Sequence, residues 1–504
     1  MSSLSTPEKS PEKSPEKATP ITSYSRRDWQ QGYLSQPQEF DYPITEITGT
    51  IPPELQGTLF RNGPGLLDIN GQTIHHPFDG DGMITALSIK DGQAHLKSRY
   101  VQTKGYVAEK AAGKILYRGV FGTQKAGGWL ANIFDFQLKN IANTNIIYWG
   151  DKLLALWEAA QPHRLDPQTL ETLGLDDLDG VLAPGAAFAA HPRIVDDRLI
   201  NFAVSPGLSS KITIYEFDRG GKLLQKQNHS VPGFSFIHDF VVTENYYIFF
   251  QNPVTFNPLP FALGIRGAGE CVGFDASKPT KILVIPRKEN QRENSSATPA
   301  LFSLETRAGF VFHHANAWEA GGKVYVDSIC YESFPDVEPG SDFRDIDFAS
   351  LDPGQLWRFS LDLDSGVVDR TLLEPCCCEF PTTNPQNMGK PYRYLYLGAG
   401  MQPTGNAPLQ QILKLDLTPD SATNTRQFWN AGDRCFVSEP IFVPHPQATA
   451  EDQGWVLSVV YDASRHRSDL VILDAQNLSN PVAKLHLQHH IPYGLHGSWT
   501  DRNF

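Results

Sequence analysis

The chain has 504 residues and a formal net charge of −13 at pH 7. It contains no block rich in Lys and Arg, so we do not expect a nucleic acid among its partners. No apolar run approaches the roughly 18 residues that a membrane-spanning helix needs, and no apolar stretch near the N-terminus indicates a secretory signal. We therefore expect a cytoplasmic protein that stays in solution or lies against a membrane surface.

The first 25 residues contain repeated Pro-Glu-Lys triplets and little apolar material. Such a segment cannot bury enough surface to fold, so we expect residues 1–25 to form a disordered tail. We expect residues 26–504 to form a single domain, because large all-β domains exceed the usual domain length. Three consecutive cysteines, Cys376 to Cys378, make a poor disulfide framework, and we expect them to be buried thiols.

Short strands and tight turns dominate the chain from Tyr42 onward. Pairs of alternating runs around Gly, Asp and Ser turn residues predict hairpins, and the clearest of them cover residues 146–158, 212–227 and 356–373. Helical periodicity is scarce. The best candidate is Gly127 to Thr144, where Leu130, Ile133 and Phe134 are spaced by three and four residues.

Many short strands separated by regular turn signals are typical of a sandwich, a barrel or a propeller. The length favours a propeller over a sandwich, although no clean blade repeat is visible. The pattern alone therefore predicts a large all-β domain.

A series of short motifs is spread along the chain. They are GTLFRNGPG (57–65), HPFDGDGM (76–83), HPRI (191–194), FIHDF (236–240), FHHANAWE (312–319), EFPTTNP (379–385), SEPIFVPHP (438–446) and LHGSW (495–499). Any one of them is a weak signal, but the ordered set is specific. It resembles the carotenoid cleavage oxygenases, the non-haem iron enzymes that split polyene double bonds. Longer stretches, such as residues 118–130 and 264–271, resemble the cyanobacterial apocarotenoid-cleaving branch of that family.

The resemblance implies an all-β fold, a seven-bladed propeller capped by loops and short helices over iron on the propeller axis. It implies Fe(2+) as cofactor and four histidines as its ligands: His191, His238, His313 and His496. Taken singly, a histidine in a strand is usually a satisfied core or surface residue, and chemistry alone does not select these from the 15 in the chain. Where two histidines adjoin, we expect His313 rather than His314 to be the ligand, because family members keep the first and adjacent strand residues face opposite ways.

The resemblance also implies three glutamates that hold ligand histidines in place: Glu158, Glu379 and Glu439. A ligand imidazole needs its second nitrogen held by such a partner. By the family pattern they support His238, His313 and His496, whereas His191 has no carboxylate partner. Thr144 matches a threonine close to the open iron position in relatives. In the absence of these motifs, the default interpretation of each glutamate would be an exposed surface residue.

We expect the open side of the iron to be lined by aromatic residues that neighbour the motifs: Trp157, Phe236, Phe312 and Tyr331. An aromatic stripe is more often plain core. In this position it would also suit a linear polyene, because it offers contact without reactive polar groups.

The implied activity is an Fe(II)-dependent dioxygenase that takes an apolar polyene and O2 and cleaves one C=C bond to two carbonyl products. The cyanobacterial branch points to apocarotenoids cut at the 15,15′ bond, with retinal-type aldehydes among the products. The alternatives are cleavage of full-length carotenoids or stilbene-type alkenes, and a catalytically silent carotenoid-binding propeller. Zinc hydrolysis suits histidine ligands, but no nucleophile motif accompanies them.

A polyene dissolved in a bilayer requires the enzyme to touch lipid, and residues 127–144 are the candidate contact. Its apolar side chains could anchor at headgroup depth, and they are Trp129, Leu130, Ile133, Phe134 and Phe136. Lys125 and Lys139 flank the stretch and would attract anionic lipid. The alternative is that this face packs on the propeller, as amphipathic stretches usually do.

Overall fold

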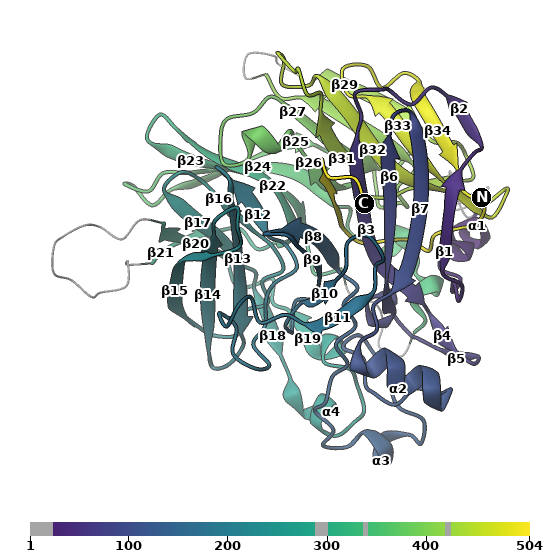
Figure 1. Ribbon diagram of the computed structural model, residues 1–504. Coiled ribbons are helices and arrows are strands. Elements are labelled where there is room, and N and C mark those ends of the chain that lie inside the picture. Colours follow the sequence, from purple (N-terminus) through teal and green to yellow (C-terminus); the bar gives the residue numbers. More distant parts are fainter. Residues whose placement is uncertain (1–23, 288–300, 336–340, 419–424) are drawn as a thin grey trace, which may run out of the picture.

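The computed structural model describes residues 24–287, 301–335, 341–418 and 425–504 (Figure 1). The expected disordered tail therefore lies outside the described residues, apart from Tyr24 and Ser25. These two belong to the fold: the Tyr24 ring meets Phe348 edge-on at 5.8 Å, and the Ser25 hydroxyl accepts the N–H of Asp28 to cap the first helix. Tyr24 and Ser25, which we expected in the tail, are thus in contact with the folded domain.

Seven antiparallel sheets of four to six strands dominate the described residues, together with two two-stranded ribbons. Each larger sheet is one blade of a propeller (Figure 1). Blade 1 holds β1 (Phe40–Ile44), β7 (Gln93–Tyr100), β6 (Asp81–Lys90), β3 (Gly57–Leu66) and β35 (Gly497–Thr500). Blade 2 holds β11 (Thr172–Leu175), β10 (His163–Leu165), β9 (Lys152–Leu156) and β8 (Asn145–Trp149). Blade 3 holds β15 (Leu223–Pro232), β14 (Ser209–Phe217), β13 (Arg198–Ser205) and β12 (Arg193–Val195).

The remaining blades follow in chain order. Blade 4 holds β21 (Phe302–Thr306), β20 (Thr280–Pro286), β17 (Tyr246–Gln251) and β16 (Phe240–Val242). Blade 5 holds β25 (Val368–Glu374), β24 (Gln355–Leu361), β23 (Lys323–Tyr331) and β22 (Phe310–Ala320). Blade 6 holds β29 (Thr425–Asn430), β28 (Gln411–Asp416), β27 (Tyr394–Ala399) and β26 (Cys378–Thr382). Blade 7 holds β2 (Ile47–Gly49), β34 (Pro481–His486), β33 (Arg467–Asp474), β32 (Gly454–Asp462), β30 (Cys435–Val437) and β31 (Ile441–Pro444).

The ribbons and helices lie outside the blades. The ribbons pair β4 (Asp68–Ile69) with β5 (Gln72–Thr73) and β18 (Val254–Phe256) with β19 (Val272–Phe274). The α-helices are α1 (Arg26–Gln31), α2 (Lys104–Ala112), α3 (Trp129–Asn132) and α4 (Pro258–Ala262). Single 3-10 turns occur at η1 (Pro77–Asp79), η2 (Gly269–Cys271), η3 (Phe343–Asp345), η4 (Phe348–Ser350) and η5 (Pro385–Asn387). Among the described residues, no helix is long and apolar enough to cross a membrane.

The two ends of the chain close the ring of blades. Strand β35 pairs with β3 in blade 1, with Leu59 opposite Trp499. Strand β2 from the N-terminal region completes the outer edge of blade 7 beside β34. The apolar core between these two blades is fully buried and includes Leu87, Leu457 and Ile472. Because both closures join early strands to late ones, the ring is complete only when the whole chain has folded.

The expected hairpins are confirmed. Strands β8 and β9 meet at Gly150 and Asp151, β14 and β15 form the second hairpin, and β24 and β25 the third. All six cysteines are free, and Cys376 to Cys378 are buried.

The expected helix over residues 127–144 is wrong, because only one turn, α3, forms there. Gly127 and Gly128 precede that turn with positive φ angles of 109° and 68°, and Phe134 and Ala142 also adopt left-handed backbone. An α-helix cannot continue through such residues. The spacing of Leu130, Ile133 and Phe134 is therefore a coincidence of loop sequence.

Helix α2 has capping residues at both ends, which the spacing of apolar residues alone does not reveal. The Thr103 hydroxyl accepts the N–H of Tyr106 at its start, and Gly113 ends it with a left-handed φ of 63°. These are the usual residues for the two ends of a helix.

Candidate metal centre

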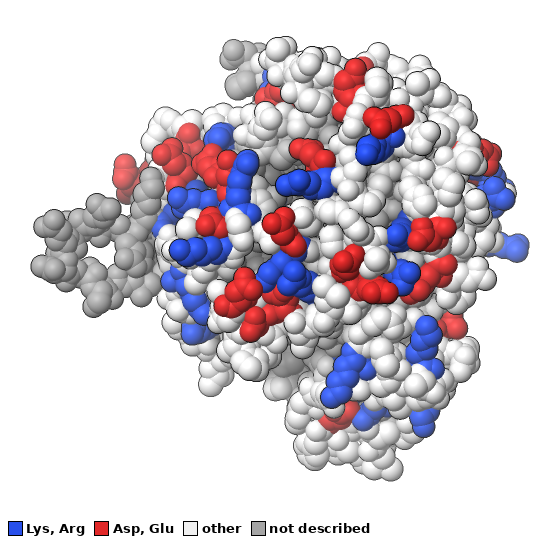
Figure 2. All heavy atoms as spheres, in the orientation of Figure 1, with Lys and Arg blue, Asp and Glu red and all other residues white. Residues whose placement is uncertain are grey.

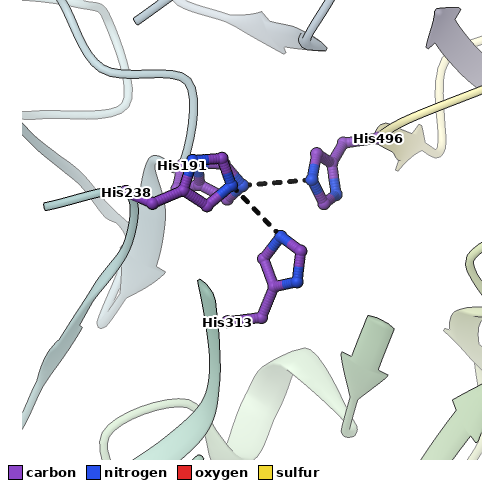
Figure 3. Close-up of side chains that lie close together, drawn as sticks. All are labelled: His191, His238, His313 and His496. Atoms are coloured by element: carbon purple, nitrogen blue, oxygen red, sulfur yellow. Dashed lines mark hydrogen bonds between the residues drawn. The ribbon is translucent and has the colours of Figure 1, made fainter. Parts of the chain in front are cut away.

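Four histidines that are far apart in the sequence meet at the centre of the propeller. One ring nitrogen from each lies within 4.8 Å of the others, and Figure 3 shows the rings converging. His191 Nε2 is 3.1 Å from His496 Nε2, and His238 Nε2 is 3.3 Å from His313 Nε2. Four imidazole nitrogens this close together form a site that could hold a cation.

The propeller architecture explains why these residues meet. His191 comes just before β12, His238 just before β16, and His496 just before β35. These strands lie at the free inner edge of blades 3, 4 and 1. His313 lies within β22, the corresponding strand of blade 5. Neighbouring inner strands contact each other, as β12 does β16 and β16 does β22. Blades 1, 3, 4 and 5 therefore each deliver one imidazole to the same point.

Strand β22 is irregular where it carries His313. Val311 pairs with Cys330, whereas Asn316 pairs with Asp327, and the register shifts twice between these pairs. Each shift places an extra residue in β22, and such bulges re-aim side chains beside functional sites. The bulges turn His313 toward the axis without ending the sheet.

The adjacent histidine faces away from the centre. His314 Nδ1 lies 2.7 Å from the Ser328 hydroxyl, and its ring meets Phe250 edge-on at 4.9 Å. Its backbone N–H donates to Asp239 at 2.8 Å. The structure thus separates the two neighbours, His313 at the axis and His314 in the core of the blade.

Three of the four rings have a carboxylate behind them, in the pairing that the motifs imply. His313 Nδ1 lies 2.6 Å from Glu379, His496 Nδ1 lies 2.8 Å from Glu439, and His238 Nδ1 contacts Glu158. A carboxylate can only accept, so Nδ1 carries the proton and the lone pair of Nε2 is free to face the centre.

The fourth ring differs from the others. His191 Nδ1 is buried and has no hydrogen-bond partner among the described residues. Its orientation is held instead by its neighbours, since its ring lies 4.2 Å from that of His238 and 4.6 Å from that of His496.

Burial shapes the charge state of the centre. It holds the pKa of His191 well below the ordinary value, reinforced by the neighbouring rings, and it lowers the pKa of His496. Burial opposes ionisation of Glu379 and Glu439, yet the adjacent imidazoles hold both carboxyl pKa values below the usual range. The pKa of His313 is raised, because nearby carboxylates outweigh burial. A raised pKa favours a second proton on His313, at Nε2. A cation at the centre would take the place of that proton.

Two residues that support the centre were missed by the sequence reasoning. Arg61 forms an ion pair with Glu439 and donates to the carbonyl of Leu495 at 3.0 Å. The sequence does contain a signal for Arg61, which is the charged residue within the otherwise uncharged motif GTLFRNGPG. A charge buried in such a strand needs a partner. Phe380 adopts a left-handed φ of 55° and packs its ring 5.6 Å from that of His313. No local signal indicates that conformation.

An aromatic cluster borders the centre beside His238. The Phe312 ring lies 5.4 Å from the His238 ring and 5.9 Å from that of Tyr331. Phe236 joins the same cluster through Phe310 and Phe334. The Tyr331 hydroxyl donates to Glu379 at 3.0 Å, so its polar end is already engaged.

The other two expected site residues lie close by. Trp157 is buried next to Glu158, although no described ring pair joins it to the aromatic cluster. Thr144 is buried, and its carbonyl accepts the backbone N–H of His496 at 3.1 Å. Its hydroxyl donates to Asn143 at 3.2 Å.

The donor set suits a divalent transition metal. Four imidazole nitrogens without thiolates are typical ligands of Fe, Zn, Cu or Ni, and the carboxylates behind three rings complete the usual arrangement. A β-propeller that gathers four imidazoles at its centre is a scaffold that could hold a metal ion.

Comparison with known proteins agrees with this class. Residues 33–501 match the protein family described as retinal pigment epithelial membrane protein, RPE65. The chain is 54% identical to apocarotenoid-15,15′-oxygenase of Synechocystis sp., over 95% of this chain and 97% of that protein. It is 30% identical to resveratrol cleavage oxygenase 1 of Botryotinia fuckeliana, over 90% of this chain and 82% of that protein. The solved structure of cobalt-substituted Synechocystis ACO matches with a TM-score of 0.91 and 53% identity, over 95% of this chain and 99% of that one.

The chain therefore belongs to the RPE65/carotenoid cleavage oxygenase family. The expected family and the seven-bladed propeller are both confirmed.

We expect His313→Ala to lose its metal, because it removes one of four ligand nitrogens and the imidazole that partners the Glu379 carboxylate. His314→Ala is the matched control, and it should keep its metal because that ring bonds Ser328 instead. Metal content per chain after anaerobic loading with Fe(II) measures both. Wild-type metal content in His313→Ala would show that His313 is not a ligand.

We expect Glu379→Gln to weaken metal binding by ~10–100-fold, the usual cost of losing a carboxylate behind a ligand imidazole. Loss should be partial, because the amide oxygen can still accept from His313 Nδ1. Competition with a chelator gives the affinity. Glu319→Gln is the control, since Glu319 binds Thr243 and Asn245 instead of a ligand. Equal affinities in the two variants would contradict the supporting role of Glu379.

Proposed function

We propose that the protein is an Fe(II)-dependent dioxygenase that cleaves one C=C bond of an apocarotenoid, at the 15,15′ position, to two carbonyl products that include a retinal-type aldehyde. The support for this substrate is the 54% identity to apocarotenoid-15,15′-oxygenase over almost the whole of both chains. The observation that carries the chemistry is the four-histidine cluster bordered by aromatic rings.

The reaction balances without a further reductant. The C=C bond breaks, and each of its carbons takes one oxygen atom from O2. Iron held by His191, His238, His313 and His496 would supply the redox chemistry that O2 needs to react with an alkene. The rest of the reaction places no demand on a protein nucleophile or general base.

The chain's own residues then have three tasks. Glu158, Glu379 and Glu439 hold the ligand rings in one orientation and keep the proton on Nδ1. The aromatic cluster around Phe312 keeps water away from the centre and offers flat apolar faces to a conjugated chain. Because the Tyr331 hydroxyl is committed to Glu379, this wall presents no free donor to a reactive substrate.

Thr144 would shape the approach to the centre. In support, its carbonyl accepts the backbone N–H of His496, and the residue is buried. We assign it a positioning role at the open side of the metal, and Trp157 and Phe236 a role in lining the substrate path.

A second candidate substrate is a stilbene-type alkene. The support is the 30% identity to a resveratrol cleavage oxygenase. The much higher identity to the apocarotenoid enzyme ranks it second, together with full-length carotenoids. A catalytically silent propeller has no need of four converging histidines and their carboxylates, which counts against that alternative.

Product masses from a panel of substrates test the activity. We expect the iron-loaded protein to convert an apocarotenal to retinal and a shorter dialdehyde, and to leave resveratrol unchanged. Incubation with 18O2 should label both new carbonyl groups if they are trapped before they exchange with water. Cleavage of resveratrol alone would support the second candidate substrate instead. If no alkene of the panel yields a product, the proposed activity is wrong.

We further propose that the protein works in a reducing compartment, the cytoplasm, while touching a bilayer that holds its substrate. The six free cysteines support the first part. For the second, the segment after α2 exposes large apolar side chains: Trp129 by 55%, Leu130 by 69%, Phe134 by 67% and Phe136 by 60%. Aromatic side chains of this kind anchor proteins at headgroup depth.

The two flanking lysines do not contribute the attraction that we expected. Lys139 is buried between Asp81 and Glu109, with Nζ 2.6 Å and 2.5 Å from their carboxylates. Lys125 is paired with Asp135 at 2.5 Å. Docking should therefore rest on the apolar side chains, and it should depend little on anionic lipid.

The double variant Trp129→Glu, Phe134→Glu should lose co-sedimentation with phosphatidylcholine vesicles, because charges would have to enter the bilayer interface. It should still cleave substrate in detergent micelles. The matched control is Leu173→Glu, Leu175→Glu on β11, which changes two side chains that are each 60% exposed elsewhere on the surface. Equal vesicle binding by the two variants would contradict docking through this segment.

A further inference from the structure

A single ion pair contacts the backbone beside three of the four converging histidines. Arg193 lies two residues after His191, at the start of β12, and Asp239 directly follows His238. Arg193 Nη2 and Asp239 Oδ2 are 2.5 Å apart. Figure 3 shows the rings of His191 and His238 beside each other, and their centroids are 4.2 Å apart. The ion pair therefore joins the two segments that carry these rings.

The same pair holds the segment of a third histidine. The backbone N–H of His314 donates to Asp239 at 2.8 Å, and the His314 carbonyl accepts from Arg193 at 2.8 Å. The N–H belongs to the peptide unit between His313 and His314, and the carbonyl belongs to the next unit. Arg193 Nε also donates to the Phe240 carbonyl at 3.0 Å. One guanidinium and one carboxylate thus connect blades 3, 4 and 5 where their inner strands meet.

Strand β22 needs such partners because of its place in the sheet. It pairs with β23 on one side, and its other edge lies against β16 of the neighbouring blade. An edge leaves backbone N–H and C=O groups without a ladder partner, and these groups need partners when they are buried. His314 is buried, and the register with β23 shifts on both sides of it. Asp239 supplies the acceptor and Arg193 the donor that the neighbouring blade cannot offer as a strand.

The pair is shielded from water. On the face drawn in Figure 2, acidic and basic side chains lie next to each other in many places, and such exposed pairs contribute little to stability. The side chains of Arg193 and Asp239 are only 14% and 1% exposed. Removal of either partner would leave an uncompensated buried charge, so the pair strongly favours one arrangement of the segments that it joins.

This arrangement matters most for His191, whose ring has no carboxylate behind it. The Ala190 carbonyl accepts from the Asn145 amide at 2.7 Å, and Arg193 holds the chain on the other side. The backbone of His191 is therefore fixed from both directions, which restricts where its ring can lie.

The fourth histidine is held separately. The N–H of His496 donates to the Thr144 carbonyl at 3.1 Å, and its own carbonyl accepts the N–H of Asn62 at 2.9 Å. Loss of the ion pair should therefore displace three ring nitrogens relative to the fourth.

We propose that Arg193 and Asp239 are positioning residues, which set the spacing of three metal ligands through the backbone beside them: His191, His238 and His313. The glutamates behind the rings fix how each ring is turned, whereas this pair fixes how far apart the rings stand. The inference rests on metal binding by the four histidines, and it does not depend on which alkene is cleaved.

The test compares Arg193→Gln and Asp239→Asn with a control of equal burial, Arg358→Gln. Arg358 forms an ion pair with Asp327 in blade 5 through two contacts of 2.8 Å, and these side chains are 20% and 0% exposed. All three variants break a buried ion pair, but only the first two break the one that contacts the ligand segments.

We expect Arg193→Gln and Asp239→Asn to weaken Co(II) binding by ~10–100-fold in competition with a chelator, the usual cost of a lost contact around metal ligands. At saturating Co(II), the visible spectrum of the bound ion, which reports the ligand geometry, should also change. The double variant should bind about as weakly as either single one, because the two residues act as a unit. Arg358→Gln should keep the wild-type affinity and spectrum, even where its melting temperature falls as far.

Each contrary result has its own meaning. Wild-type affinity and spectrum in both Arg193→Gln and Asp239→Asn would overturn the inference. An equal loss of affinity in Arg358→Gln would do the same, because general stability would then be the cause. Failure of the wild type to bind Co(II) would instead overturn the metal centre on which the inference rests.

Arg193→Lys keeps the inference testable if the neutral variants do not fold. Lysine retains a positive charge opposite Asp239, but its single nitrogen cannot reproduce the fork that also reaches the carbonyls of Phe240 and His314. We expect a folded protein with weaker Co(II) binding and a changed spectrum. Wild-type values of both would overturn the positioning role of the guanidinium.

Discussion

The pairing of β35 with β3 is the constraint on which the metal centre depends. His191 and His496 are separated by 305 positions in the sequence, yet their Nε2 atoms lie 3.1 Å apart. That proximity exists only because the last strand returns to blade 1 beside an early one. Failure of this closure would remove His496 from the cluster and open the ring.

Within the closed ring, carboxylates and buried ion pairs fix the orientation of groups that regular secondary structure does not hold. The ligand segments are the ends and irregularities of inner strands, and carboxylates fix the orientation of their rings. The same solution recurs away from the axis. Lys139 between Asp81 and Glu109 anchors the segment that leads to Thr144, and Arg118 holds the segment before it. A buried charge is costly without partners, so each of these residues specifies one arrangement of the chain around it.

Local features of this fold were readable from the sequence. The hairpin over residues 212–227 was predictable because turn residues and alternating runs act over a few positions. Ordered motifs predicted the four histidines, the glutamates behind three of them and the family. The helix expected over residues 127–144 failed because glycines and left-handed residues interrupt it, while periodicity registers only the apolar positions. The role of Arg61 depends on Glu439 and Leu495, which lie more than a hundred positions away, and no short pattern contains such partners.

The order of the four histidines along the chain, with His496 last, has a consequence for how the protein is made. Domains begin to fold during synthesis from the N-terminal side, and the segments that carry His191, His238 and His313 emerge from the ribosome well before the last ligand. Until the segment with His496 and β35 has emerged, the fourth imidazole is missing. The complete four-histidine cluster thus forms only after β35 has paired with β3 in blade 1, and binding of a metal by all four imidazoles would follow that closure.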